Sequence, residues 1–166
     1  MDKNLSNEKA LKKYKELVDE IKVGMFITDS PDKDHTRPMY TIESEDDGTL
    51  WFFTNKNSTK LDEVNSNHKV HLVYAHPGKE SYLDIWGTAT VTADQQTIKD
   101  KWWPMLKAWF PQGVDDPDLA LLRVQPDDCF YWDAEAGKMI SFLKIIAGAI
   151  TGKPGISSDA KGELNI

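Results

Sequence analysis

The chain has 166 residues, a formal net charge of −7 and 40% hydrophobic residues. This length suits one domain with a substantial core, and the acidic balance argues against nonspecific binding to nucleic acid or to anionic membranes. A single cysteine, Cys129, excludes an internal disulfide and favours a reducing, cytoplasmic location. The polar N-terminus predicts no signal peptide, and the longest apolar run, 145–150, is too short to span a bilayer.

Apolar residues at helical spacing predict an amphipathic helix over residues 7–22. Segments rich in β-branched and aromatic residues then predict strands at 25–28, 37–42, 50–54, 70–74 and 82–92. Turn signals separate these segments, and most of the connections are too short for a crossover helix. The strands are therefore expected to be antiparallel neighbours.

The second half of the chain predicts shorter elements. Asp94 is a suitable N-cap for a second helix that runs to Trp109, with a kink at Pro104. Asp116 and Pro117 predict a short helical turn through Leu119, Leu121 and Leu122, and residues 129–132 predict a last strand.

These elements predict a mainly β fold with flanking helices: one antiparallel barrel, closed or nearly closed, with helices packed outside it. We expect one domain over residues 1–151, followed by a mobile C-terminal segment at 152–166 that is rich in Gly, Ser, Pro and Lys.

The strand at 50–54 leads into a turn with the features of an anion site. Ser58 is a suitable N-cap for a helix that carries Leu61 and Val64, and a helix start directs free backbone N–H groups at one point. Hydroxyls of Thr54, Ser58 and Thr59 and the charge of Lys60 would add further donors. A phosphate site is one interpretation of this pattern, and a solvated turn with an ordinary capping serine is the other.

Other candidate residues are weaker. A strand would separate His68 and His71 onto opposite faces, and no completing ligands are evident, so we expect no metal site. Cys129 lies in an apolar segment and is expected to be a buried small hydrophobe. Five tryptophans are assigned to packing: Trp51, Trp86, Trp102, Trp103 and Trp109.

Several motifs together resemble the pyridoxamine 5′-phosphate oxidase-like superfamily of FMN-binding split barrels, in its general stress protein 26 branch. The motifs are Thr-Arg-Pro-Met at 36–39, Leu-Trp-Phe-Phe-Thr-Asn at 50–55, Ser-Thr-Lys at 58–60, the run at 74–79, Trp-Phe-Pro at 109–111, the run at 116–124 and Tyr-Trp-Asp at 131–133. The similarity covers about residues 8–152. It implies a homodimer with two flavin sites at the subunit interface.

The resemblance also implies which residues contact the flavin: Arg37, Pro38, Met39, Phe53, Thr54, Ser58, Thr59, Lys60, Tyr82 and Trp132. In this comparison Arg37 faces the FMN phosphate, and residues 58–60 complete its cradle. Tyr82 stands where the oxidase often has a glutamine, and Trp132 would reach the flavin of the partner subunit. For Arg37 the alternative is a surface strand residue paired with a nearby acid, and for Trp132 it is a core position.

Three functions follow from the resemblance. The first is an FMN-dependent oxidoreductase acting on an unknown small molecule, and the second is a non-catalytic flavin-binding or flavin-buffering stress protein. The third, a pyridoxamine 5′-phosphate oxidase, is least favoured because its substrate carries a phosphate of its own. The chain has only two arginines, Arg37 and Arg123, and none follows Trp132. The choice between FMN and FAD stays open.

Overall fold

The computed structural model describes residues 7–29, 35–133 and 138–141. The helices are α1 (Asn7–Ile21), α2 (Thr59–Ser66) and α3 (Gln95–Lys101), with 3₁₀ turns η1 (Pro77–Lys79), η2 (Pro104–Ala108) and η3 (Gly113–Asp115). The strands are β1 (Val23–Thr28), β2 (His35–Tyr40), β3 (Glu43–Ser44), β4 (Leu50–Asn55), β5 (Lys69–His76), β6 (Ser81–Thr92), β7 (Leu119–Asp133) and β8 (Lys138–Ser141).

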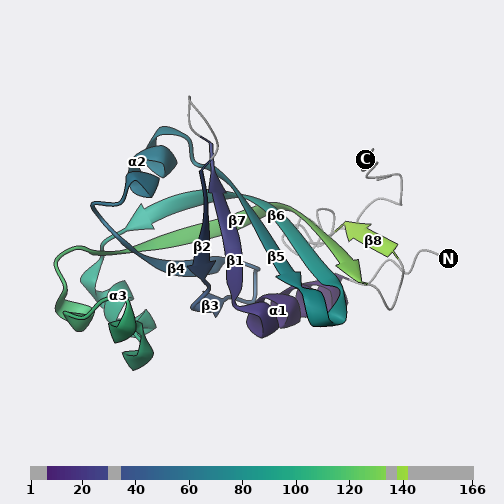
Figure 1. Cartoon of the computed structure of the whole chain (residues 1–166), viewed down its shortest axis with the longest axis horizontal. Coiled ribbons are helices and arrows are strands. Elements are labelled where there is room, and N and C mark those ends of the chain that lie inside the picture. Colours follow the sequence, from purple (N-terminus) through teal and green to yellow (C-terminus); the bar gives the residue numbers. More distant parts are fainter. Residues whose placement is uncertain (1–6, 30–34, 134–137, 142–166) are drawn as a thin grey trace.

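All the strands belong to one antiparallel sheet with the order β2-β1-β5-β6-β7-β4-β3 (Figure 1). The long strand β7 pairs with β6 on one side. On its other side it pairs with β4 over Leu119–Val124 and with β8 over Phe130–Asp133. The predicted antiparallel sheet is therefore confirmed, and the fold is that of a split β-barrel.

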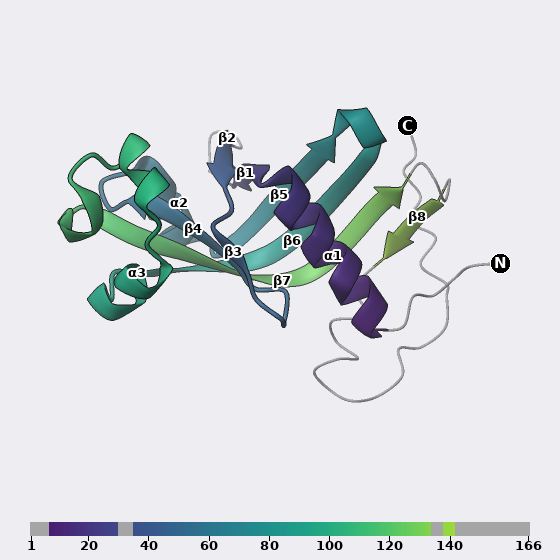
Figure 2. The same ribbon diagram turned by 90° about the horizontal axis from the view of Figure 1, so that it is seen from below.

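The barrel is split because β2 and β3 lie at opposite ends of the strand order. The chain passes from β2 to β3 through Thr41 and Ile42, and the backbone N–H of Ile42, next to β3, donates to the carbonyl of Trp51 on β4 at 2.9 Å. Helix α1 lies across the open side against β5 and β6, as Figure 2 shows. The expected flanking helices are thus confirmed, and α1 and α2 contribute buried side chains to the same apolar cluster as the sheet.

The main hydrophobic core joins these helices to the inner face of the sheet. Tyr14 and Val18 from α1 and Val64 from α2 are fully buried together with Phe26 and Phe52, whose rings make an edge contact at 5.6 Å. A second cluster lies on the other face of β4, where Trp51 and Phe53 pack against residues from α3 and η2. Strand β4 is therefore buried on both faces between two apolar clusters.

Two predicted elements differ from the structure. The helix after Asp94 has the expected cap, with the Thr97 N–H donating to the Asp94 carboxylate at 2.9 Å, but it ends at Lys101. Trp102 is extended and a separate 3₁₀ turn begins at Pro104, because proline lacks the N–H that a continuous helix needs.

The helical turn expected after Asp116 is also wrong, because Leu119 already begins β7. The apolar residues that suggested a helical turn instead alternate between the two faces of that strand. The 152–166 segment and the boundary at residue 151 lie outside the described residues. Within the described part of the chain, no helix has the length and apolar character needed to cross a membrane.

Candidate functional site

The turn between β4 and α2 has the geometry that the sequence predicts. Ser58 is extended and its hydroxyl oxygen accepts the backbone N–H of Lys60 at 3.3 Å. The Asn55 side chain accepts the N–H of Asn57 at 2.7 Å, which tightens the turn. The N-cap prediction for Ser58 is confirmed, and this cap fixes where the side chains of the first turn of α2 point.

Lys60 is buried, with only 8% of its surface exposed, which argues against the alternative of a fully solvated turn. Its ammonium lies 3.1 Å from the Met39 sulfur, and none of the described carboxylates forms an ion pair with it. Burial, together with the nearby charge of Arg37, lowers the pKa of Lys60 from 10.5 to about 8, although Glu63 acts in the opposite direction. A buried cation without a paired anion is unfavourable on its own.

Arg37 faces the same side of the sheet as its register partner Phe26, toward α2. Its Nη2 donates to Glu63 Oε2 at 2.9 Å, so the arginine does pair with an acid. Its other terminal nitrogen, Nη1, is buried and has no hydrogen-bond partner among the described residues. The N–H groups of Nη1 are thus available to donate to a ligand.

Glu63 is the site residue that sequence reasoning missed. It accepts hydrogen bonds from Thr28, Arg37 and the ring of His35, which come from two neighbouring strands. Burial alone would raise its pKa, but these hydrogen bonds outweigh burial and lower the pKa to about 2. The available signal was its position three residues after Lys60, on the same face of the helix.

Thr54 lies on the inner face of β4 and its hydroxyl is buried without a partner in the described part of the chain. Arg37, Lys60 and Glu63 lie close to one another. Ser58 caps the helix that carries Lys60 and Glu63, and Thr54 lies near the end of the strand that leads into it. We call these five residues the α2 cluster. Among the residues that the structure describes, an arginine nitrogen, a hydroxyl and an ammonium of this cluster lack an oxygen acceptor. Such a set of donors suits an anion, and a phosphate in particular.

The remaining predicted residues take different positions. Met39 is buried beside Lys60, whereas Pro38 and Thr59 are exposed. The Phe53 ring points into the second apolar cluster, 5.6 Å from the Trp102 ring, so only its backbone is available on the α2 side.

Tyr82 and Trp132 are register partners on β6 and β7, and they lie on the outer face of the sheet, 43% and 42% exposed. In the strand order, β1 and β5 lie between Arg37 on β2 and Tyr82 on β6, and β6 also lies between Arg37 and Trp132. The side chains of Tyr82 and Trp132 point to the other face of the sheet. One chain therefore does not bring these two aromatic residues to the α2 cluster. The core position considered for Trp132 is wrong.

The outer face carries several large apolar side chains that water can reach. Its most exposed members are Val23, Met25, Tyr82, Trp86 and Trp132. Trp86 is 49% exposed and stacks on the His71 ring with centroids 3.9 Å apart. We call this set the outer apolar face.

Three of the tryptophans assigned to packing are exposed. The packing assignment is wrong for Trp86, Trp103 and Trp109. Strand alternation turns Trp86 outward, and the other two flank η2 at the surface. Trp51 and Trp102 do pack in the second cluster, and Cys129 is fully buried as expected.

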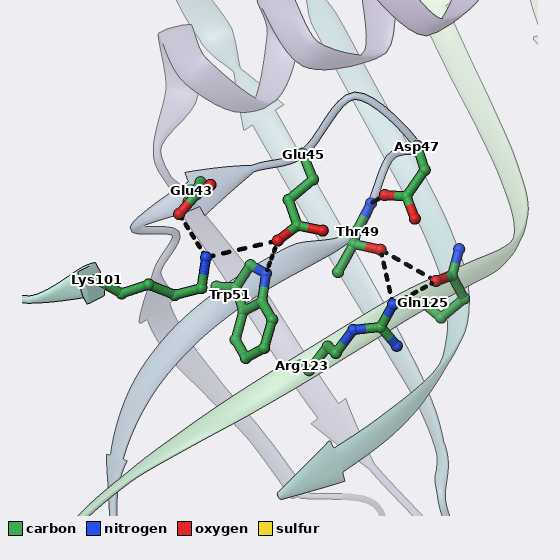
Figure 3. Close-up of polar contacts among 8 residues, drawn as sticks. All are labelled: Glu43, Glu45, Asp47, Thr49, Trp51, Lys101, Arg123 and Gln125. Carbon is green, nitrogen blue, oxygen red and sulfur yellow. Dashed lines mark hydrogen bonds and ion pairs between the residues drawn. The ribbon is translucent and has the colours of Figure 1, made fainter. Parts of the chain in front are cut away.

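The second arginine, Arg123, belongs to a structural network around the β3–β4 hairpin (Figure 3). Its guanidinium donates to the Gln125 side chain at 3.1 Å, and Thr49 donates to the same oxygen at 3.0 Å. Beside it, Lys101 at the end of α3 pairs with Glu43 at 2.7 Å and lies 4.4 Å from the centre of the Trp51 ring. Arg123 therefore stabilises the hairpin and is not part of the α2 cluster.

Comparisons with known proteins give a consistent result. The family model described as pyridoxamine 5′-phosphate oxidase like matches residues 9–155. General stress protein 26 of Bacillus subtilis is 31% identical over 120 residues, which are 70% of this chain and 83% of that protein.

Solved structures agree with this match. A general stress FMN/FAD binding protein from Xanthomonas citri superposes with a TM-score of 0.65 and 27% identity, over 74% of this chain and 87% of that one. A protein related to general stress protein 26 from Clostridium acetobutylicum has a TM-score of 0.71 at 24% identity, over 81% of this chain and 94% of that one.

Proposed function

Because the chain belongs to the pyridoxamine 5′-phosphate oxidase-like family, we propose that it binds a flavin and that the flavin phosphate occupies the α2 cluster. The single observation that carries this proposal is the pair Lys60 and Arg37. The buried ammonium of Lys60 donates to the Met39 sulfur and to no described oxygen, and Nη1 of Arg37 is buried with no hydrogen-bond partner among the described residues. The related protein from Xanthomonas citri, described as binding FMN or FAD, supports the same cofactor class.

The residues fit a phosphate monoester better than a neutral ligand. Phosphate oxygens accept several hydrogen bonds at once, and Nη1 of Arg37, the ammonium of Lys60 and the Thr54 hydroxyl are the donors available. The Ser58 hydroxyl caps the helix as an acceptor, so its proton remains able to donate. FMN, with its terminal phosphate, is the form we propose, and FAD is the alternative.

When bound, a flavin supplies hydride and electron transfer, and the chain supplies binding and orientation. We propose an FMN-dependent oxidoreductase of the general stress type that acts on a small molecule. A flavin-binding stress protein without a substrate is the second candidate. Tyr82 and Trp132 lie on the outer apolar face and not beside Lys60, so within one chain they do not complete a substrate site at the α2 cluster. Their positions therefore do not decide between an enzyme and a flavin-binding protein without a substrate.

We further propose that the outer apolar face is covered by a second copy of the chain. Exposed apolar patches of this kind mark interaction surfaces. A homodimer would bring Tyr82 and Trp132 of one subunit to the other subunit, as the family resemblance implies. A cytoplasmic location stays a prediction.

The test begins with the absorbance spectrum of the purified protein and titrations of FMN, FAD and riboflavin. We expect FMN to bind and riboflavin, which lacks the phosphate, to bind poorly. Anaerobic addition of NADH or NADPH then separates the two candidates: bleaching of bound FMN and reoxidation by an acceptor support an enzyme. A protein that binds riboflavin as tightly as FMN would contradict a phosphate site at the α2 cluster.

A further inference from the structure

We propose that Glu63 is a positioning residue that acts through Arg37, holding its guanidinium so that Nη1 faces the phosphate. This inference rests on the proposed function, because the phosphate is that of the flavin. A carboxylate next to a phosphate site is unexpected on charge alone, since it repels the ligand. The geometry around Glu63 explains why it is there.

The Glu63 carboxylate forms hydrogen bonds with residues of two strands, β1 and β2. Thr28 and Arg37 both donate to Oε2, and the His35 ring contacts Oε1. Thr28 and His35 are register partners on β1 and β2, so the carboxylate of α2 bridges the ends of both strands. Its side chain is 11% exposed, and few alternative orientations remain for it.

This anchoring determines the direction of Arg37. A guanidinium is planar, so fixing Nη2 against Glu63 Oε2 at 2.9 Å limits where Nη1 can point. Nη1 is the atom that is buried without a partner among the described residues. Glu63 therefore binds Nη2 and leaves Nη1 oriented before the ligand arrives. This orientation lowers the conformational entropy that Arg37 loses when the ligand binds.

Two conservative variants separate this role from a simple effect of charge. Glu63→Gln keeps the length of the side chain and an oxygen that can accept from Arg37, but it removes the charge. Glu63→Asp keeps the charge and withdraws the carboxylate from Arg37 by one methylene. Positioning predicts FMN binding within about threefold of wild type for Gln, and binding weakened by roughly tenfold for Asp. A charge effect predicts the reverse: tighter binding for Gln and little change for Asp.

The dependence on Arg37 is tested by a double-mutant cycle. In an Arg37→Met background, Glu63→Asp should change the FMN dissociation constant by less than about twofold, because the residue it positions is gone. Riboflavin titrations and thermal unfolding without ligand accompany every variant. The affinity for riboflavin should be the same in the wild type and in the Glu63 variants, because riboflavin lacks the phosphate.

Four results would overturn the inference. The first is an Asp variant that binds FMN as tightly as wild type, and the second is a Gln variant that loses as much affinity as Asp. The third is an undiminished Asp effect in the Arg37→Met background, which would mean that Glu63 acts through Lys60 or through the fold. Finally, failure of the wild type to bind FMN would reject the proposed function itself and this inference with it.

Discussion

Replacing Lys60 by methionine should make the unliganded protein more stable and its FMN binding weaker. Methionine keeps an unbranched side chain of similar length, so the packing beside Met39 is preserved while the ammonium is removed. Opposite effects on stability and binding are typical of a residue kept for function.

The magnitude on stability follows from burial. A fall in the pKa of Lys60 from 10.5 to about 8 means that the folded protein disfavours the charged lysine by about 3 kcal/mol, at about 1.4 kcal/mol per pKa unit. At pH 7 the lysine is protonated in both states, so the variant should gain up to about 3 kcal/mol in unfolding free energy. Above pH 8 the native state loses its proton before the unfolded state does. Wild-type stability therefore rises toward pH 10.5 and the advantage of the variant shrinks.

The magnitude on binding follows from the lost contact. A charge-assisted hydrogen bond is worth about 1.5–3 kcal/mol, so FMN should bind Lys60→Met about 10- to 150-fold more weakly. Riboflavin should bind both proteins equally poorly.

Urea unfolding at pH 7 and pH 9 and titrations of both flavins measure these effects. Lys56→Met is the matched control, because Lys56 is an exposed lysine of the same turn that donates to the Pro117 carbonyl. It removes the same charge and should leave both quantities nearly unchanged. If Lys60→Met lowers stability and leaves FMN affinity intact, Lys60 is a structural residue and the phosphate binds elsewhere. Equal weakening of FMN and riboflavin would contradict the reasoning as well.

Further predictions concern other parts of the molecule. Thr54→Val replaces a buried hydroxyl that has no partner in the described part of the chain, and it should raise stability by about 1 kcal/mol while weakening FMN binding several-fold, measured by urea unfolding and titration. Trp86→Glu should dissociate the proposed dimer in sedimentation experiments, whereas Trp109→Glu, at an exposed position off the sheet, should not. Acid unfolding should show that wild type loses stability between about pH 5 and pH 2 and that Glu63→Gln loses less, because the folded pKa of Glu63 is lowered from 4.5 to about 2. Pyridoxamine 5′-phosphate should yield little hydrogen peroxide, since the chain has two arginines, of which Arg37 is proposed to hold the flavin phosphate and Arg123 is held in the hairpin network, so neither is left for a substrate phosphate.

Local signals in the sequence were sufficient for most of the fold. The strands were found because β-branched and aromatic residues dominate them, and the caps at Ser58 and Asp94 act through neighbours within three residues. The failures came where pairing over long distances overrode a local signal. Residues after Asp116 form a strand because they pair with β4, 64 to 74 residues earlier in the chain.

The site was predictable in part for the same reason. Lys60 and Ser58 lie in one turn, so their proximity could be seen in the sequence. The burial of Lys60 depends on β2, and the partners of Glu63 lie 26 to 35 residues away. No local pattern reports such contacts, and the helical spacing between Lys60 and Glu63 was the only hint.

The burial of β4 on both faces also determines how one wall of the site is held. Shifting β4 would disturb the packing of Phe52 on one side and of Phe53 on the other, so the strand that carries Thr54 is held firmly. Across the site, Arg37 belongs to β2, an edge strand whose backbone is paired only with β1 among the described strands. The Arg37 side of the α2 cluster is therefore held less by strand pairing than by Glu63, which ties β2 to α2, whereas the Thr54 side is held by the packing of β4.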